Sequence, residues 1–198
     1  MNKYYNLFFF LFFLSVASQN DVMNIKKMYE SINSYNLDYS LIISTQKDNQ
    51  DVKIIEESGT MFGNNSSFKI KHENIDVISD GEKIYNIIHN IKEINITDYS
   101  ENNLWNPVYI FKNFLERINS DLITQKKDHI QVKFLDSDLE RTFTFFLDKN
   151  YNIFKLELNT EGSKSKTTIL INKLQFTDKT FNINFDNSIY KEYYLNFL

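Results

Sequence analysis

Residues that could act as catalysts or metal ligands are few in this sequence, and their spacing suits neither task. The 198 residues include three histidines, His72, His89 and His129, and no cysteine. Long stretches place the histidines on different predicted strands, so no pair has the spacing of a metal-binding motif. We interpret them as exposed or rim side chains, and we predict no metal site.

Motifs for phosphate binding and for nucleophilic catalysis are also missing. The chain has four glycines, Gly59, Gly63, Gly81 and Gly162, and they form no glycine-rich loop that could hold a phosphate. No G-x-S-x-G motif marks a hydrolase nucleophile. A lipid hydrolase would need a nucleophile–base pair, and the sequence shows none. We therefore predict a binding protein that is not an enzyme and that requires no cofactor.

The first residues have the pattern of a secretory signal peptide, which we assign to residues 1–18. Lys3 supplies a positive start, an unbroken apolar run extends from Leu7 to Leu14, and small residues follow. This run is much shorter than the ~20 residues that a membrane-spanning helix needs, although an uncleaved anchor is the alternative. Residues 19–198 are then predicted to form one soluble domain outside the cytoplasm.

Charge and cysteine content limit the classes of partner that the mature chain could bind. The net charge is −4, and no basic run is long enough to bind a nucleic acid, so we exclude that class of partner. The chain also lacks the cysteine that would anchor a bacterial lipoprotein at the end of its signal. The protein could therefore handle lipidated cargo without being lipid-anchored itself, and we expect a monomer.

Two segments have apolar residues at three- and four-residue steps, which indicates amphipathic helices. The first runs from Val22 to Ile32. The second follows Asn106-Pro107, where proline occupies the first helical position at no cost in hydrogen bonds. The apolar face of this second helix is formed by Val108, Ile110, Phe111, Phe114, Leu115 and Ile118.

Most other segments alternate apolar and polar residues, as strands with one buried face do. We predict strands at residues 37–45, 54–62, 68–72, 75–78, 84–88, 91–97, 122–126, 130–135, 141–147, 153–158 and 167–174. Asp80-Gly81 predicts a hairpin turn, and short connections favour antiparallel neighbours. The predicted fold is mainly β: an incomplete, half-open antiparallel β-barrel of about ten or eleven strands, with an N-terminal helix and an inserted lid helix over the concave face. The structure of the tail after Phe185 is left open.

The segment from Ile78 to Asn86 (ISDGEKIYN) resembles the strand–turn–strand motif of the LolA family, the periplasmic carriers of outer-membrane lipoproteins. The similarity extends upstream to Glu57–Phe62 (ESGTMF) and Phe68–Ile70 (FKI). Downstream it includes Ile91–Ile96 (IKEINI) and the helix that follows Asn106-Pro107. The resemblance thus covers nearly the whole mature chain through short motifs in a matching order.

This resemblance implies an incomplete barrel with a helical lid, whose cavity takes the acyl chains of lipoproteins. The implied partners are acylated lipoproteins, an inner-membrane lipoprotein-releasing ABC transporter and an outer-membrane acceptor, and the implied location is the periplasm. The acceptor of that system is itself a lipoprotein, so the missing cysteine favours the carrier role. Some carriers hold the lid closed through an Arg near the position of Gly63–Ser67 (GNNSS), and its absence puts that mode of closure in question.

A carrier needs an apolar hollow that its own side chains do not fill, and a filled core is the competing interpretation. We expect the cavity to be lined from the strands by Tyr39, Leu41, Met61, Ile70, Val77, Tyr85 and Ile87, and from the lid helix by Ile110, Phe111, Phe114 and Leu115. A slip of one residue would turn the side chains of a strand to its other face. Alternative functions are a periplasmic lipid-sensing regulatory module and a carrier of another lipid, such as a glycolipid or a pigment precursor.

Overall fold

The computed structural model describes residues 19–30, 34–47, 50–64, 67–99, 107–137, 139–177 and 181–198. The predicted signal peptide, residues 1–18, lies outside these ranges, as do Ile32 and the side chain of Val108. No helix within the described ranges is both long enough and apolar enough to cross a membrane.

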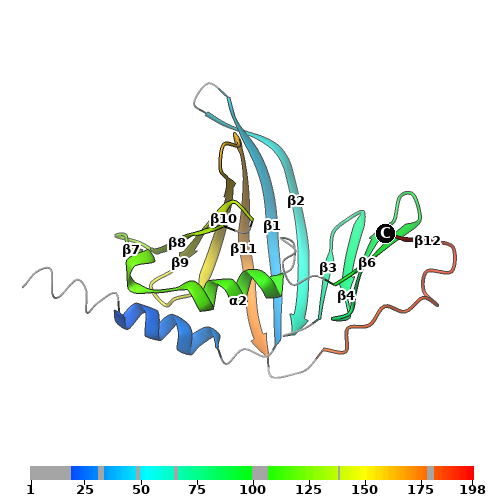
Figure 1. Cartoon of the computed structure of the whole chain (residues 1–198), viewed down its shortest axis with the longest axis horizontal. Coiled ribbons are helices and arrows are strands. Elements are labelled where there is room, and N and C mark those ends of the chain that lie inside the picture. Colours follow the sequence, from blue (N-terminus) through cyan, green and yellow to red (C-terminus); the bar gives the residue numbers. More distant parts are fainter. Residues whose placement is uncertain are drawn as a thin grey trace, which may run out of the picture.

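Twelve strands in the described residues form a single sheet that curves without closing into a barrel (Figure 1). They are β1 (Ser34–Lys47), β2 (Gln50–Asn64), β3 (Phe68–Lys71), β4 (Ile75–Ser79), β5 (Lys83–Ile88), β6 (Glu93–Asp98), β7 (Ile123–Gln125), β8 (Ile130–Asp136), β9 (Arg141–Leu147), β10 (Ile153–Thr160), β11 (Ser165–Thr177) and β12 (Tyr194–Phe197). Their spatial order is β12-β6-β5-β4-β3-β2-β1-β11-β10-β9-β8-β7. The predicted half-open barrel is confirmed.

Among the described strands, β12 is the one that does not pair in the predicted antiparallel way. It pairs in parallel with β6, with Tyr194 opposite Glu93 and Phe197 opposite Ile96. In the view of Figure 1 the preceding residues, 181–193, run below β3 and β4 and bring the chain to the outer edge of β6. The sheet therefore has more strands than predicted, because the C-terminal tail forms β12.

The two predicted helices are present on one side of the sheet. The N-terminal helix covers residues 19–29, and α2 (Pro107–Arg117) is inserted between β6 and β7, followed by a short 3₁₀ helix, η1 (Ser120–Leu122). Residues of both helices pack in one cluster with side chains of β8 to β11. The N-terminal helix begins and ends earlier than the predicted range from Val22 to Ile32.

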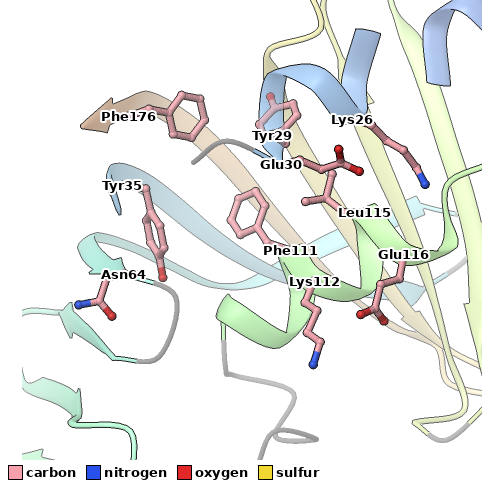
Figure 2. A pocket seen from close by; sticks show the side chains of 10 residues that line it. All are labelled: Lys26, Tyr29, Glu30, Tyr35, Asn64, Phe111, Lys112, Leu115, Glu116 and Phe176. Atoms are coloured by element: carbon pink, nitrogen blue, oxygen red, sulfur yellow. The ribbon is translucent and has the colours of Figure 1, made fainter. Parts of the chain in front are cut away.

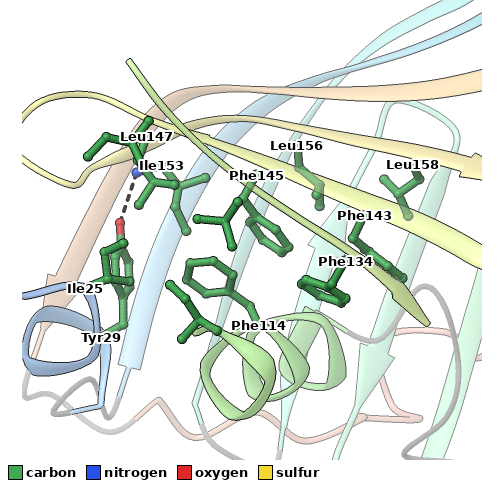
Figure 3. Close-up of a cluster of buried hydrophobic side chains, with 13 residues drawn as sticks. Ile25, Tyr29, Phe114, Phe134, Phe143, Phe145, Leu147, Ile153, Leu156 and Leu158 are labelled. Atoms are coloured by element: carbon green, nitrogen blue, oxygen red, sulfur yellow. Dashed lines mark hydrogen bonds between the residues drawn. The ribbon is translucent and has the colours of Figure 1, made fainter. Parts of the chain in front are cut away.

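A core of aromatic and aliphatic side chains joins both helices to β8, β9 and β10 (Figure 3). Phe114 of α2 is fully buried, and its ring centroid lies 4.3 Å from that of Phe145. Tyr29 of the N-terminal helix donates to the Tyr151 carbonyl at 2.9 Å and accepts from the Ile153 N–H at 3.0 Å. Burial raises the pKa of Tyr29 to about 12.

A second core lies on the opposite face of β4, β5 and β6, beneath the C-terminal tail. Ile87 and Ile94 are fully buried there, and the tail contributes Ile183 and Tyr190 to the same cluster. Because this part of the sheet buries both faces, its strands carry apolar residues on both sides. On β5, therefore, an apolar side chain can lie on either face of the sheet.

The predicted turn at Asp80-Gly81 is confirmed. Gly81 has a φ of 96°, a left-handed conformation that glycine adopts without steric cost. The Asp80 carboxylate accepts from the N–H groups of Glu82 at 2.9 Å and Lys83 at 2.8 Å, and from the Tyr85 hydroxyl at 3.2 Å. Partial desolvation favours a higher pKa, but these hydrogen bonds outweigh it and hold the pKa of Asp80 below its ordinary value.

Candidate functional site

A largely apolar cavity of about 380 Å³ lies between α2 and the concave face of the sheet, and we call it the central pocket. Its size falls within the range of about 300–1,000 Å³ that is usual for small-molecule sites. The interior is therefore not completely filled by the core described above. This unfilled space is the feature on which the sequence-based carrier hypothesis depends.

The register of the sheet explains why its residues converge on the pocket. Leu37 lies opposite Met61, Met61 opposite Ile70, Ile70 opposite Val77, and Val77 opposite Asn86. Directly paired residues in an antiparallel sheet point to the same face. These five side chains thus form one row across β1 to β5, and all of them line the pocket.

Five of the seven strand residues expected to line a cavity do line the central pocket: Tyr39, Leu41, Met61, Ile70 and Val77. Tyr85 and Ile87 lie on the other face. Because Asn86 is the residue opposite Val77, Ile84 and Asn86 face the pocket. Tyr85 instead stacks on Phe185 of the tail with ring centroids 4.2 Å apart, and Ile87 belongs to the core beneath that tail.

The residues expected on the lid helix divide among three places. Ile110 and Phe111 lie over the central pocket. Phe114 is part of the core against β9, and Leu115 lines a separate cavity at the edge of the helices. Only the N-terminal half of α2 therefore covers the pocket.

Part of the lining was missed by the sequence interpretation. Phe145, Ile153, Leu156, Ile169 and Ile171 come from β9, β10 and β11 and close the other side of the pocket. The alternation within the predicted strand at residues 167–174 could have indicated Ile169 and Ile171. It could not show that β11 pairs with β1, which is the contact that brings these residues to the site.

Polar groups in the pocket wall are few. The Tyr39 hydroxyl and His72 Nε2 are 2.8 Å apart, and His72 Nδ1 lies 3.7 Å from a Glu57 carboxylate oxygen. Burial, with a smaller contribution from Glu57, raises the pKa of Tyr39. All three histidines are half-buried rather than exposed, and His72 lies in the wall of the pocket.

Two glycines on β2 leave room for tyrosine rings from β1. Gly59 is paired with Tyr39, and Gly63 with Tyr35. A Cβ atom on Gly59 would lie 2.8 Å from Tyr39 Cζ, and one on Gly63 would lie 2.6 Å from the Tyr35 hydroxyl. Glycine at these two places therefore allows the rings to lie close against β2 and form part of the concave surface.

The C-terminal half of α2 is held to β8 by polar contacts. Asn113 donates to the buried Asp136 carboxylate at 3.0 Å. Arg117 donates to Asn113 at 2.9 Å and to the Leu135 carbonyl at 3.2 Å, and it lies 3.7 Å from Asp136. These contacts and the burial of Phe114 fix this half of the helix.

A second cavity of about 460 Å³, which we call the rim cavity, lies where the N-terminal helix, α2 and the start of β1 meet (Figure 2). Tyr29, Tyr35, Leu115 and Phe176 form apolar walls around it. Figure 2 shows the Phe111 ring near its centre, between Tyr35 and Leu115. Phe111 lines both this cavity and the central pocket.

Within the described residues, no group of three or more His, Asp or Glu side chains could hold a metal ion. None of the described residues lining the central pocket is Lys or Arg. Such a wall is suited to hold an apolar chain.

Several solved structures share features of this architecture. The chain resembles a LolA superfamily protein. That structure, from Nitrosomonas europaea, has a TM-score of 0.39 and 7% identity, over 87% of this chain and 96% of the other. A putative outer membrane lipoprotein-sorting protein domain from Vibrio parahaemolyticus has a TM-score of 0.43 and 9% identity, over 86% and 97% of the two chains.

A third similar structure is an uncharacterized conserved protein from Thermus thermophilus. It has a TM-score of 0.47 and 6% identity, over 90% of this chain and 98% of the other. No protein-family model and no curated protein sequence matches the chain. At these identities the likeness concerns the fold alone, so a function has to be argued from the pocket.

Proposed function

We propose that this protein is a periplasmic carrier that shields the acyl chains of lipoproteins in the central pocket and delivers them from the inner to the outer membrane. The observation that carries the proposal is the unfilled apolar cavity of about 380 Å³ beneath α2. The sequence motifs that resemble the LolA family, and the signal-peptide pattern at residues 1–18, support the same role. Its partners would be a lipoprotein-releasing ABC transporter and an outer-membrane acceptor.

The physical task of such a carrier is to keep hydrocarbon out of water. Each buried methylene contributes about 0.8 kcal/mol, so an acyl chain does not cross an aqueous space unaided. The central pocket offers apolar contacts from both the sheet and α2, so it shields a chain fully only while α2 stays in place. Release requires the cover formed by Ile110 and Phe111 to move.

The first test places a bulky side chain in the pocket. Val77 is half-buried and lines the pocket, so Val77→Trp places an indole ring in the space that a chain would occupy. We expect a fluorescent fatty-acid probe to bind the wild type and to lose at least tenfold in affinity for the variant. Val52→Trp, at an exposed position on β2, is the matched control and should bind normally.

A second measurement separates the carrier from a lipid-sensing module. The mature protein is incubated with liposomes that contain a palmitoylated lipoprotein, and the liposomes are then sedimented. A carrier leaves a soluble complex with the lipoprotein in the supernatant. Equal probe affinity in the wild type and Val77→Trp, together with no lipoprotein in the supernatant, would refute the proposed function.

A further inference from the structure

The rim cavity differs in chemistry from the central pocket beside it. Its lining includes four charged side chains: Lys26 from the N-terminal helix, Glu30 directly after that helix, and Lys112 and Glu116 from α2. Each pair of Lys and Glu is four residues apart, a spacing that places both side chains on the same side of a helix. In Figure 2 these four side chains lie on the helix side of the cavity, and Tyr35 and Phe176 lie on the opposite side.

The balance of charge restricts what this cavity can hold. An anionic group would meet the two glutamates as well as the two lysines, and a cationic group would meet the lysines as well as the glutamates. A group that carries one charge of each sign can face both kinds of side chain at once. The cavity is therefore complementary to a zwitterionic group with some apolar surface.

Phe111 connects the two cavities. Its side chain contributes to the walls of both, and its ring centroid lies 6.0 Å from that of Tyr35 in the rim cavity. A molecule whose chain fills the central pocket must place its polar end beyond one mouth of that pocket. Burial of a polar or charged group is costly unless it finds partners, and the rim cavity offers partners directly across Phe111.

We infer that the rim cavity binds the zwitterionic end of the same amphiphile whose acyl chain occupies the central pocket. This inference rests on the proposed function and names the ligand class: an acyl chain joined to a head that carries both charges. Phe111 is the contact shared by both parts of the ligand. The lysines attract its anionic group and the glutamates its cationic group.

The test compares two ligands with the same chain. Palmitoyl lysophosphatidylcholine has a zwitterionic head, and monopalmitoylglycerol has an uncharged one. Each displaces a fluorescent fatty-acid probe from the wild type, and we expect the zwitterion to bind about tenfold more tightly, a difference of about 1.4 kcal/mol. A palmitoylated peptide amide with one Lys and one Glu forms a second arm that distinguishes a lipid head from a peptide.

Charge-reversed variants show which side chains cause the preference for the zwitterionic ligand. Lys26→Glu with Lys112→Glu should abolish the preference for the zwitterion and leave the affinity for monopalmitoylglycerol unchanged. Glu30→Lys with Glu116→Lys should do the same. Lys127→Glu with Lys164→Glu, at two exposed positions outside both linings, changes the net charge as much as the lysine reversal does and should keep the preference.

The outcomes distinguish the inference from the function on which it rests. Equal affinity of the wild type for the uncharged ligand and for both zwitterionic ligands overturns the inference and leaves the carrier function standing. Failure of every ligand to displace the probe overturns both. A preference that survives both charge reversals places the head elsewhere and also overturns the inference.

Discussion

At the scale of single residues, the carboxylate of Asp80 shows how one side chain fixes the geometry next to the site. It accepts two backbone N–H groups of its own turn and the Tyr85 hydroxyl. The turn sets the register between β4 and β5, in which Ser79 lies opposite Ile84 and Val77 opposite Asn86. That register decides which residues of β5 face the central pocket.

We therefore expect Asp80→Ala to lower the free energy of unfolding by about 1 kcal/mol at neutral pH, because the variant loses hydrogen bonds to a charged acceptor. The pKa of Asp80 is lowered in the folded state. Its stabilisation is thus present above the carboxyl's ordinary pKa and is lost as the pH falls below that value. Denaturant titrations across this range should show the wild type approaching the variant in acid. Asp51→Ala, at an exposed position on β2, should change stability little, and a constant difference between wild type and Asp80→Ala at all pH values would contradict the argument.

The pattern of apolar residues along single strands explains which site residues could be predicted from the sequence. Alternation on β1 and β3 identified Tyr39 and Ile70 because only one face of these strands is strongly apolar. On β5 it selected Tyr85 and Ile87, which are apolar because the tail buries the other face. Nothing in the local pattern distinguishes a face that covers a pocket from one that is covered by a distant segment.

At the scale of elements, α2 combines two tasks along eleven residues. Its C-terminal half is part of the core through Phe114 and bonds to β8 through Asn113 and Arg117. Its N-terminal half contributes Ile110 and Phe111 to the pocket. The sequence predicted this helix and its apolar face. A wide apolar face alone does not show which of its residues pack in the core and which cover the pocket.

This division predicts different effects for two phenylalanines, Phe111 and Phe114, on α2. Phe114→Ala should lower the free energy of unfolding by about 3–5 kcal/mol, because it leaves a cavity in a close-packed core. Phe111→Ala should cost less stability, since the side chain is half-buried, and should weaken binding of a fluorescent fatty acid several-fold. Thermal unfolding and probe titration of the two variants provide the comparison. If Phe111→Ala is the more destabilising and binds normally, the cover of the pocket lies elsewhere.

At the scale of the whole molecule, the C-terminal tail acts as a cover for the far face of β4, β5 and β6. Ile183 and Tyr190 pack there over Ile87 and Ile94. The sequence interpretation left this segment open, because its aromatic residues follow no period that identifies a helix or strand. Its role depends on a surface formed by residues far earlier in the chain, as the hydrogen bond from Asn196 to Asn95 illustrates.

Removal of residues 181–198 should expose this apolar surface and lower the free energy of unfolding, on the order of 1.5–3 kcal/mol for each large apolar side chain that loses its cover. Binding of a hydrophobic dye and denaturant titration measure the two effects. Removal of residues 194–198 alone is the control, because every residue of β12 is exposed. The shorter deletion should therefore be far milder, and equal effects of the two deletions would show that β12, rather than the tail core, stabilises this edge.

Because β1 lies in the centre of the sheet, the sheet is complete only after strands from both ends of the chain have paired with it. One edge of β1 pairs with its neighbour β2, whereas the other pairs with β11, so that Ser34 lies opposite Thr177. During synthesis the segments from β1 to β6 can assemble from near neighbours, but one edge of β1 stays open until the distant β11 has been made. Closing so distant a contact is slow, and an open strand edge can pair with other chains. The edge of β1 is thus open to pairing with other chains until β11 covers it.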